Sequence, residues 1–170
     1  MGQVWVILVS VTAPLPLVAQ VSSPAGIPVP VVTFTGGVGN AMGWFGVQAE
    51  RYFVQGRVSA FGGLGYTPSV ETYDPSGVTV AAGLRGYTAG RKHRAFAEAS
   101  GCQVATLSDP IEPSRFYGPC FQLGYQFASR GGFTVALSGG VGFALGVPQG
   151  YRAAQPLLGL GFGYTWRRRT

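Results

Sequence analysis

Residues 155–166 read QPLLGLGFGYTW and carry the most regular side-chain pattern used to predict the fold. From residue 158 onward a large apolar residue stands at every second position, and a small residue stands between each pair. The large residues are Leu158, Leu160, Phe162, Tyr164 and Trp166, and the small ones are Gly159, Gly161, Gly163 and Thr165. A period of two is the pattern of a β-strand with one apolar face. The segment is therefore predicted to be a strand that presents bulky groups on one side and almost none on the other.

The same alternation recurs along the chain, and no stretch after Pro30 has a helical period. Eight strands are predicted near Val31–Gly39, Trp44–Phe53, Arg57–Thr67, Gly77–Thr88, Arg94–Leu107, Arg115–Ala128, Gly132–Leu145 and Gln155–Trp166. Most are close to the ~9–11 residues with which a tilted strand crosses a bilayer. The predicted fold class is all-β, an eight-stranded antiparallel up-and-down transmembrane β-barrel.

The scarcity of charge supports a membrane barrel over a soluble one. The chain has 12 basic and 6 acidic residues, 11% of its 170 residues, against a usual ~25%. The face opposite the bulky residues carries mostly Gly, Ala, Ser and Thr, which suits a crowded interior better than a surface in water. A secreted soluble barrel that binds an apolar ligand is the alternative, with the two faces exchanged.

The predicted connections alternate in length. Gln55–Gly56, Gly90–His93 and Ser129–Gly131 are short, whereas 68–76, 108–114 and 146–154 are long; only 40–43 is short at the second rim. Short turns at one rim and long loops at the other, with an even strand number, are typical of bacterial outer-membrane barrels.

On these features, residues 30–166 resemble the small eight-stranded outer-membrane barrel proteins, the family of OmpA-type transmembrane domains and OmpX-like proteins. The final strand, PLLGLGFGYTW, is similar to the family's C-terminal assembly signal. The resemblance implies a monomer in the bacterial outer membrane, with membrane lipids and the assembly machinery as partners.

The N-terminus predicts export. Val4–Val11 is a short apolar run, and the residues up to Ala19 resemble a signal peptide and its cleavage site. A buried strand or a membrane helix is the alternative. The expected division is 1–19 signal peptide, 20–30 lead-in, 31–166 barrel and 167–170 basic tail.

Three charged residues inside the predicted strands have the inward parity, whereas Arg51 has the outward parity. Glu50, Arg85 and Glu98 are expected to form a salt-bridge cluster, since a turn at Gly90–His93 sets Arg85 opposite Glu98. The side chains expected to plug the lumen with them are Gln48, Gln122, Gln126, Tyr52, Phe61 and Tyr87. An ion path or a narrow small-solute channel is the alternative.

The two cysteines, Cys102 and Cys120, flank the connection at 108–114 at equal distances from Ile111. A hairpin centred there sets them opposite each other, and an exported chain meets an oxidising compartment. We therefore expect a cross-strand disulfide, with two separate thiols or a metal site as alternatives. A metal site is disfavoured because the lone histidine, His93, lies elsewhere, and no cofactor is expected.

Basic residues gather at the rim of short turns. The predicted periplasmic rim comprises Arg57, Arg91, Lys92, Arg94 and Arg130, with Arg167, Arg168 and Arg169 of the tail beside it. This rim can meet anionic lipid headgroups or the cell wall, or it can simply solvate the turns. The placement argues against nucleic acid as a partner.

No arrangement of residues predicts an enzyme. His93 lies in a basic turn without a nearby carboxylate, and no serine has an adjacent base. The expected function is a structural or surface-interaction role, in which an external ligand would meet long-loop residues such as Tyr73, Asp74, Asp109, Tyr151 and Arg152.

Overall fold

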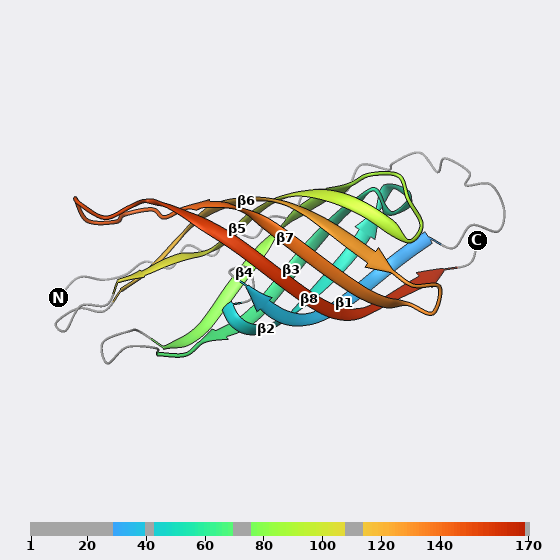
Figure 1. Ribbon diagram of the computed structural model, residues 1–170, viewed down its shortest axis with the longest axis horizontal. Coiled ribbons are helices and arrows are strands. Elements are labelled where there is room, and N and C mark those ends of the chain that lie inside the picture. Colours follow the sequence, from blue (N-terminus) through green and yellow to red (C-terminus); the bar gives the residue numbers. More distant parts are fainter. Residues whose placement is uncertain (1–28, 40–42, 70–75, 108–113, 169–170) are drawn as a thin grey trace, which may run out of the picture.

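The computed structural model describes residues 29–39, 43–69, 76–107 and 114–168, and these residues form a closed barrel of eight antiparallel strands (Figure 1). The strands are β1 (Val29–Gly39), β2 (Gly43–Phe53), β3 (Val58–Thr67), β4 (Gly77–Tyr87), β5 (His93–Leu107), β6 (Ser114–Ala128), β7 (Phe133–Phe143) and β8 (Ala154–Arg168). Each strand pairs with the next, and β1 pairs with β8 to close the wall. The prediction of an all-β, eight-stranded up-and-down barrel is confirmed.

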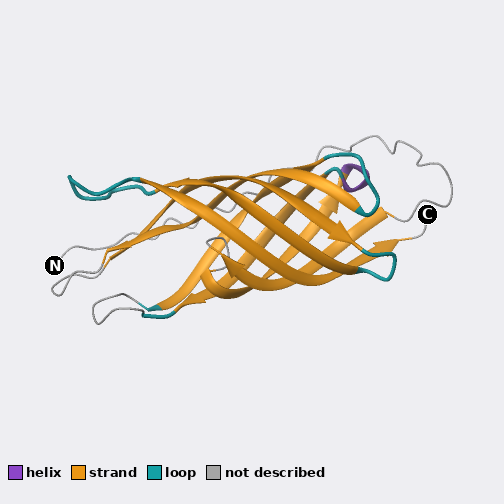
Figure 2. Cartoon of the chain, in the orientation of Figure 1, coloured by secondary structure: helices purple, strands orange, loops and turns teal. Residues whose placement is uncertain are grey.

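Helical structure is almost absent from the described residues (Figure 2). The short 3₁₀ turn η2 (Val54–Gly56) joins β2 to β3. Within the described ranges, no helix is long and apolar enough to cross a membrane.

The strand ends differ from the prediction by small amounts. The barrel begins at Val29 and ends at Arg168, so part of the expected lead-in and of the basic tail belongs to the wall. The β2–β3 connection is 54–57 rather than a two-residue turn, because Gln55 and Gly56 both take positive φ, 58° and 80°. The predicted signal peptide and residues 20–28, 169 and 170 lie outside the described residues.

The two ends of the barrel are unlike. The connections 54–57, 88–92 and 129–132 gather at one end, together with Val29 and Arg168; we call this the short-turn end (Figure 1). The other, the long-connection end, carries the connections that leave β3, β5 and β7. There the β7–β8 hairpin extends beyond the wall, at the left of Figure 1.

The two faces of the wall follow the alternation of the sequence. Large apolar residues face outward and are exposed, with Leu123 at 72% and Leu158 at 73% of their surface. Polar residues face the lumen, where Gln48, Glu50 and Gln126 are buried. The middle of the lumen is therefore polar, and the outer surface of the wall is apolar.

Candidate functional site

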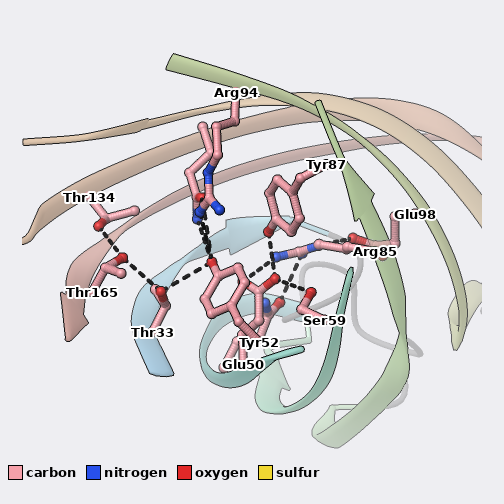
Figure 3. Close-up of polar contacts among 12 residues, drawn as sticks. Thr33, Glu50, Tyr52, Ser59, Arg85, Tyr87, Arg94, Glu98, Thr134 and Thr165 are labelled. Carbon is pink, nitrogen blue, oxygen red and sulfur yellow. Dashed lines mark hydrogen bonds and ion pairs between the residues drawn. The ribbon is translucent and has the colours of Figure 1, made fainter. Parts of the chain in front are cut away.

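The middle of the lumen holds a buried ion cluster in which one arginine lies between two glutamates (Figure 3). The strand register sets Arg85 of β4 opposite Glu98 of β5. Arg85 Nε donates to Glu98 Oε2 at 2.7 Å, and Arg85 Nη1 donates to Glu50 Oε2 at 3.2 Å. The structure thus brings together the three residues that the sequence grouped.

Both carboxylates also accept hydrogen bonds from neutral groups. Glu50 accepts from the hydroxyls of Ser59 and Tyr87. Glu98 accepts from Ser100 Oγ at 2.9 Å and from Gln122 Nε2 at 3.2 Å. Buried charge is tolerated when its hydrogen-bonding capacity is met in this way, so the cluster is a paired and satisfied network.

The remaining surface of Arg85 is covered by an amide and two rings. Its Nη2 donates to Gln48 Oε1 at 3.3 Å. Its guanidinium carbon lies 4.5 Å from the centre of the Phe61 ring and 4.8 Å from that of Phe96. Aromatic faces attract a cation that has left water, so Arg85 is held on every side.

A second buried arginine lies nearer the short-turn end. Arg94 donates to Gly56 O at 3.1 Å, to Tyr52 OH at 3.2 Å and to Gln126 Oε1. Its guanidinium carbon also lies 4.9 Å from the centre of the Tyr52 ring and 4.3 Å from the centre of the Tyr87 ring. Figure 3 shows Arg94 pointing into the lumen toward Tyr52.

The prediction that Arg94 belongs to the exposed basic rim is therefore wrong. Arg94 is only 5% exposed. The physical reason is the alternation within β5, because Arg94 shares its parity with Phe96 and Glu98, which face the lumen. The alternation of residues in β5 could have indicated that Arg94 faces the lumen. Its proximity in sequence to Arg91 and Lys92 suggested the rim instead.

Three threonines extend the network to the last layer of the lumen, and the sequence analysis missed them. Thr33 and Thr134 each lie 2.7 Å from Thr165 through their hydroxyl oxygens, and Thr33 donates to Tyr52 OH at 3.2 Å. All three are almost completely buried. A continuous chain of polar contacts thus crosses the barrel at the short-turn end.

The lumen around the ion cluster is filled. Among the described residues, a small cavity of about 30 Å³ lies beside Arg85, Gln48, Gln122 and Ser138. Such a space holds little more than a water molecule. All six residues expected to plug the lumen are buried: Gln48, Tyr52, Phe61, Tyr87, Gln122 and Gln126.

Toward the long-connection end the lumen becomes apolar. Cys102 and Cys120 form a disulfide there, with their Cα atoms 6.3 Å apart. The two cysteines are not directly opposite, because Cys102 pairs with Gly118 and Cys120 with Ser100. Two shifts of one residue make the bridge diagonal: Leu107 pairs with Ser114, already one residue from a register centred on Ile111, and the bulge between Gln103 and Ala105 adds the second shift. Val104, Leu157, Ala81 and Ala144 pack with the disulfide.

An open cavity of about 580 Å³ lies at the long-connection end. It is lined by the ends of β1, β2 and β3 and by β5, with Trp44, Thr67, Gln103 and Val104 among the lining residues. Gln103 is 8% exposed, and its Oε1 has no hydrogen-bond partner among the described residues.

The predicted basic rim, apart from Arg94, lies on the surface of the short-turn end. Arg57, Arg91, Lys92 and Arg130 are exposed in the three turns. Arg167 at the end of β8 donates to the carbonyl oxygens of Arg91 and Ala128, at 3.2 and 3.0 Å. It thereby ties two turns to the end of the last strand.

Residues that could bind a metal ion are not gathered in the described part of the chain. No group of three or more His, Cys, Asp or Glu that could hold a metal ion occurs there. His93 is exposed at the start of β5, where its Nδ1 contacts Tyr125 OH and its ring packs beside Phe127. The acidic loop residues Glu71, Asp74, Asp109 and Glu112, and also Tyr73, lie outside the described residues.

Comparison of the chain with protein families, with curated proteins and with solved structures gave no match.

Proposed function

We propose that this protein is an outer-membrane β-barrel of the bacterial cell envelope, with a structural or surface-interaction role and a lumen plugged by side chains. The proposal includes OmpA- or OmpX-like behaviour as a monomer that needs no cofactor and catalyses no reaction.

The observation that carries this proposal is the apolar outward face, which continues around the whole wall. Val47, Leu64, Val80, Leu137 and Leu158 come from five different strands and are all more than half exposed. Soluble monomers rarely expose a contiguous apolar patch larger than a few hundred Å². Lipid is the solvent that suits such a surface.

Aromatic residues at two levels of the outer face support the same proposal. Phe53, Phe133 and Trp166 lie near the short-turn end, and Phe45, Tyr66, Tyr117 and Phe143 lie toward the other end; all are exposed. Rings of this kind favour the two interfaces between hydrocarbon and water.

The filled lumen favours a structural role over transport. A solute would have to pass Arg85, both glutamates and the Tyr52–Arg94 contact, and every one of these groups is held by hydrogen bonds or ion pairs. We therefore assign any interaction with external ligands to the long-connection end, where Tyr151 and Arg152 are exposed.

Export and assembly complete the proposal. Residues 1–19 would act as the signal peptide, and the strand that ends in Trp166 would be read by the outer-membrane assembly machinery. The basic short-turn end would then face the periplasm, since outer-membrane barrels have their short turns there.

Heat-modifiable gel migration tests the proposal. The full chain, expressed in a Gram-negative host, should be found in the outer-membrane fraction and should require detergent for extraction. Its band should shift when the unboiled sample is compared with the boiled one. Protein that is soluble without detergent, with no shift on boiling, would refute the proposal and favour the secreted soluble barrel.

Planar-bilayer recording separates the plugged barrel from a narrow channel. A plugged lumen predicts no discrete single-channel steps under conditions in which an open porin conducts. Reproducible steps that change with Arg85→Met would instead support a channel through the ion cluster.

Ligand binding at the open end is a second candidate, favoured by the cavity of about 580 Å³ and by the buried Oε1 of Gln103. Its volume lies within the usual range for small-molecule sites. In the background Trp5→Phe with Trp166→Phe, a shift of Trp44 emission on addition of a neutral single-chain amphiphile such as a monoacylglycerol, lost in Gln103→Leu and Val104→Phe, would support it. Unchanged emission would leave the cavity as a feature of the fold alone.

A further inference from the structure

The short-turn end carries a ring of cations that surrounds the barrel and has no described carboxylate within it. Its members come from β2, from all three turns and from the end of β8: Arg51, Arg57, Arg91, Lys92, Arg130, Arg167 and Arg168. The carboxylates among the described residues are Glu50 and Glu98, and both face the lumen and pair with Arg85. Within the described ranges, no carboxylate offsets the positive charge of this ring.

The strand register places part of this ring at the level of the aromatic residues. Val32 of β1 pairs with Arg51 of β2 on one side and with Trp166 of β8 on the other. Arg51 is exposed on the outward face, two residues before Phe53. The Trp166 ring packs edge to face against the rings of Phe34 and Tyr164, with ring centres 5.5 and 4.7 Å apart. An arginine thus lies in the same belt as three rings.

That position has a physical meaning. Tryptophan and tyrosine favour the level of lipid headgroups, and an outward arginine near the end of a strand extends its charged group to the same level. A guanidinium there forms bidentate contacts with phosphate. Binding of a soluble polyanionic polymer would not require Arg51 to lie among aromatic rings on the outer wall.

The turns that bear the other cations are held in place. Arg167 bonds the carbonyl oxygens of Arg91 and Ala128, so the β4–β5 turn and the end of β6 are tied to β8. The charged groups of Arg91, Lys92 and Arg130 are thereby displayed from a fixed rim.

We propose that this ring binds the phosphate groups of anionic phospholipids in the leaflet at the short-turn end. This inference rests on the proposed function and names a partner for it. The ring concentrates anionic lipid around one end of the barrel and so fixes the depth and direction of the protein in the membrane.

Tryptophan quenching by brominated lipids tests this directly. The chain contains three tryptophans, so Trp5→Phe with Trp44→Phe leaves Trp166 as the reporter of the short-turn end. Trp5→Phe with Trp166→Phe leaves Trp44 as the reporter of the other end. Each protein is reconstituted in two sets of vesicles made of phosphatidylcholine and phosphatidylglycerol. In one set the phosphatidylglycerol is brominated, and in the other the phosphatidylcholine is brominated. Both leaflets have the same composition, so the direction of insertion does not affect the result.

We expect brominated phosphatidylglycerol to quench Trp166 at least roughly twofold more than the same fraction of brominated phosphatidylcholine. Trp44 should be quenched equally by the two lipids. In the variant with Arg51, Arg57, Arg91, Lys92, Arg130 and Arg168 replaced by Gln, the preference at Trp166 should fall to near equality; Arg167 is kept because it holds the β4–β5 turn. The control variant, Arg115→Gln with Arg152→Gln at the other end, should keep it.

Three outcomes separate the possibilities. Equal quenching of Trp166 by the two lipids in the unmodified ring would overturn the proposal. Equal quenching together with cation-dependent sedimentation on isolated cell-wall sacculi would also overturn it and would assign the ring to a polyanionic polymer. No quenching by either lipid would contradict membrane insertion, and hence the proposed function itself.

Discussion

The outer face and the lumen of this barrel are built from alternate residues of the same strands, and they follow opposite rules. In β6, Gln122 is buried and bonded to Glu98 and Ser138, whereas its neighbour Leu123 is 72% exposed. A soluble protein places these residue types the other way. Polar contacts therefore stabilise the middle of the barrel interior, whereas the outer face requires a surrounding apolar medium.

The largest effect is expected from the lumen. Arg85→Met leaves Glu50 and Glu98 buried without their cation, and removal of one partner from a buried ion pair costs about 3–5 kcal/mol. Urea unfolding in phospholipid vesicles, followed by tryptophan fluorescence, measures the change in free energy of unfolding. The exposed Arg57→Met should change it by less than about 0.5 kcal/mol.

A rescue experiment makes this prediction more specific. Glu50→Gln and Glu98→Gln, added to Arg85→Met, remove the uncompensated charge and should restore most of the lost stability. A triple variant no more stable than Arg85→Met would show that the residue acts through packing alone.

The outer face should give the next largest effect. Leu123→Arg places a charge on the outward face midway between Tyr117 and Phe127, and such a charge costs about 2–4 kcal/mol at the bilayer midplane. Leu145→Arg, beyond the end of β7, should cost only about 0–1 kcal/mol. Equal costs at the two positions in vesicles would contradict a lipid-facing band.

The disulfide stabilises the apolar part of the lumen, near the long-connection end. Replacement of Cys102 and Cys120 by Ser should lower the free energy of unfolding by about 2–3 kcal/mol, because the open chain gains conformational freedom. Proteolysis should then begin in the β5–β6 hairpin. The ion cluster lies further down the lumen, so migration of the unboiled band should stay unchanged. Loss of that folded band would show that the bridge is needed for closure of the whole barrel.

The smallest effect comes from glycines on the two faces. A Cβ at the inward-facing Gly163 would lie 1.9 Å from Phe34 O, whereas one at the outward Gly62 would meet nothing within 4 Å. Gly163→Ala should therefore cost about 1–3 kcal/mol through overpacking, and Gly62→Ala should be neutral or slightly stabilising. Thermal unfolding of the two variants side by side measures the difference. Similar melting temperatures would argue against a close approach of β8 to β1.

The sequence predicted the faces better than the details of register. The alternation around Gln48 and Glu50 identified the lumen side of β2, and the turn near Gly90 brought Arg85 to Glu98. Neither the bulge near Val104 nor the pairing of Leu107 with Ser114 has a comparable signal in the sequence, so the cysteines are expected to be opposite, whereas the structure sets them diagonally. A bulge depends on how the two strands bend in space, which a period of two does not encode.

The predicted rim shows a different limit. Arg94 was grouped with its charged neighbours, although its parity matched the lumen side of β5. Its burial depends on the Tyr52 and Tyr87 rings and on Gln126, which come from three other strands. Thr33 and Thr165 meet only where β1 pairs with β8 to close the barrel, so their contact has no signal along the chain, and Thr134 of the neighbouring strand β7 joins them there.

Quenching of a single tryptophan placed on the outer face shows whether that face meets lipid. Leu123→Trp in the background Trp5→Phe, Trp44→Phe and Trp166→Phe gives a single reporter halfway along β6. In vesicles, phospholipid brominated in the middle of its acyl chain should quench it strongly, and aqueous acrylamide should quench it weakly. Strong quenching by acrylamide without quenching by the brominated lipid would contradict a barrel whose outer face meets lipid.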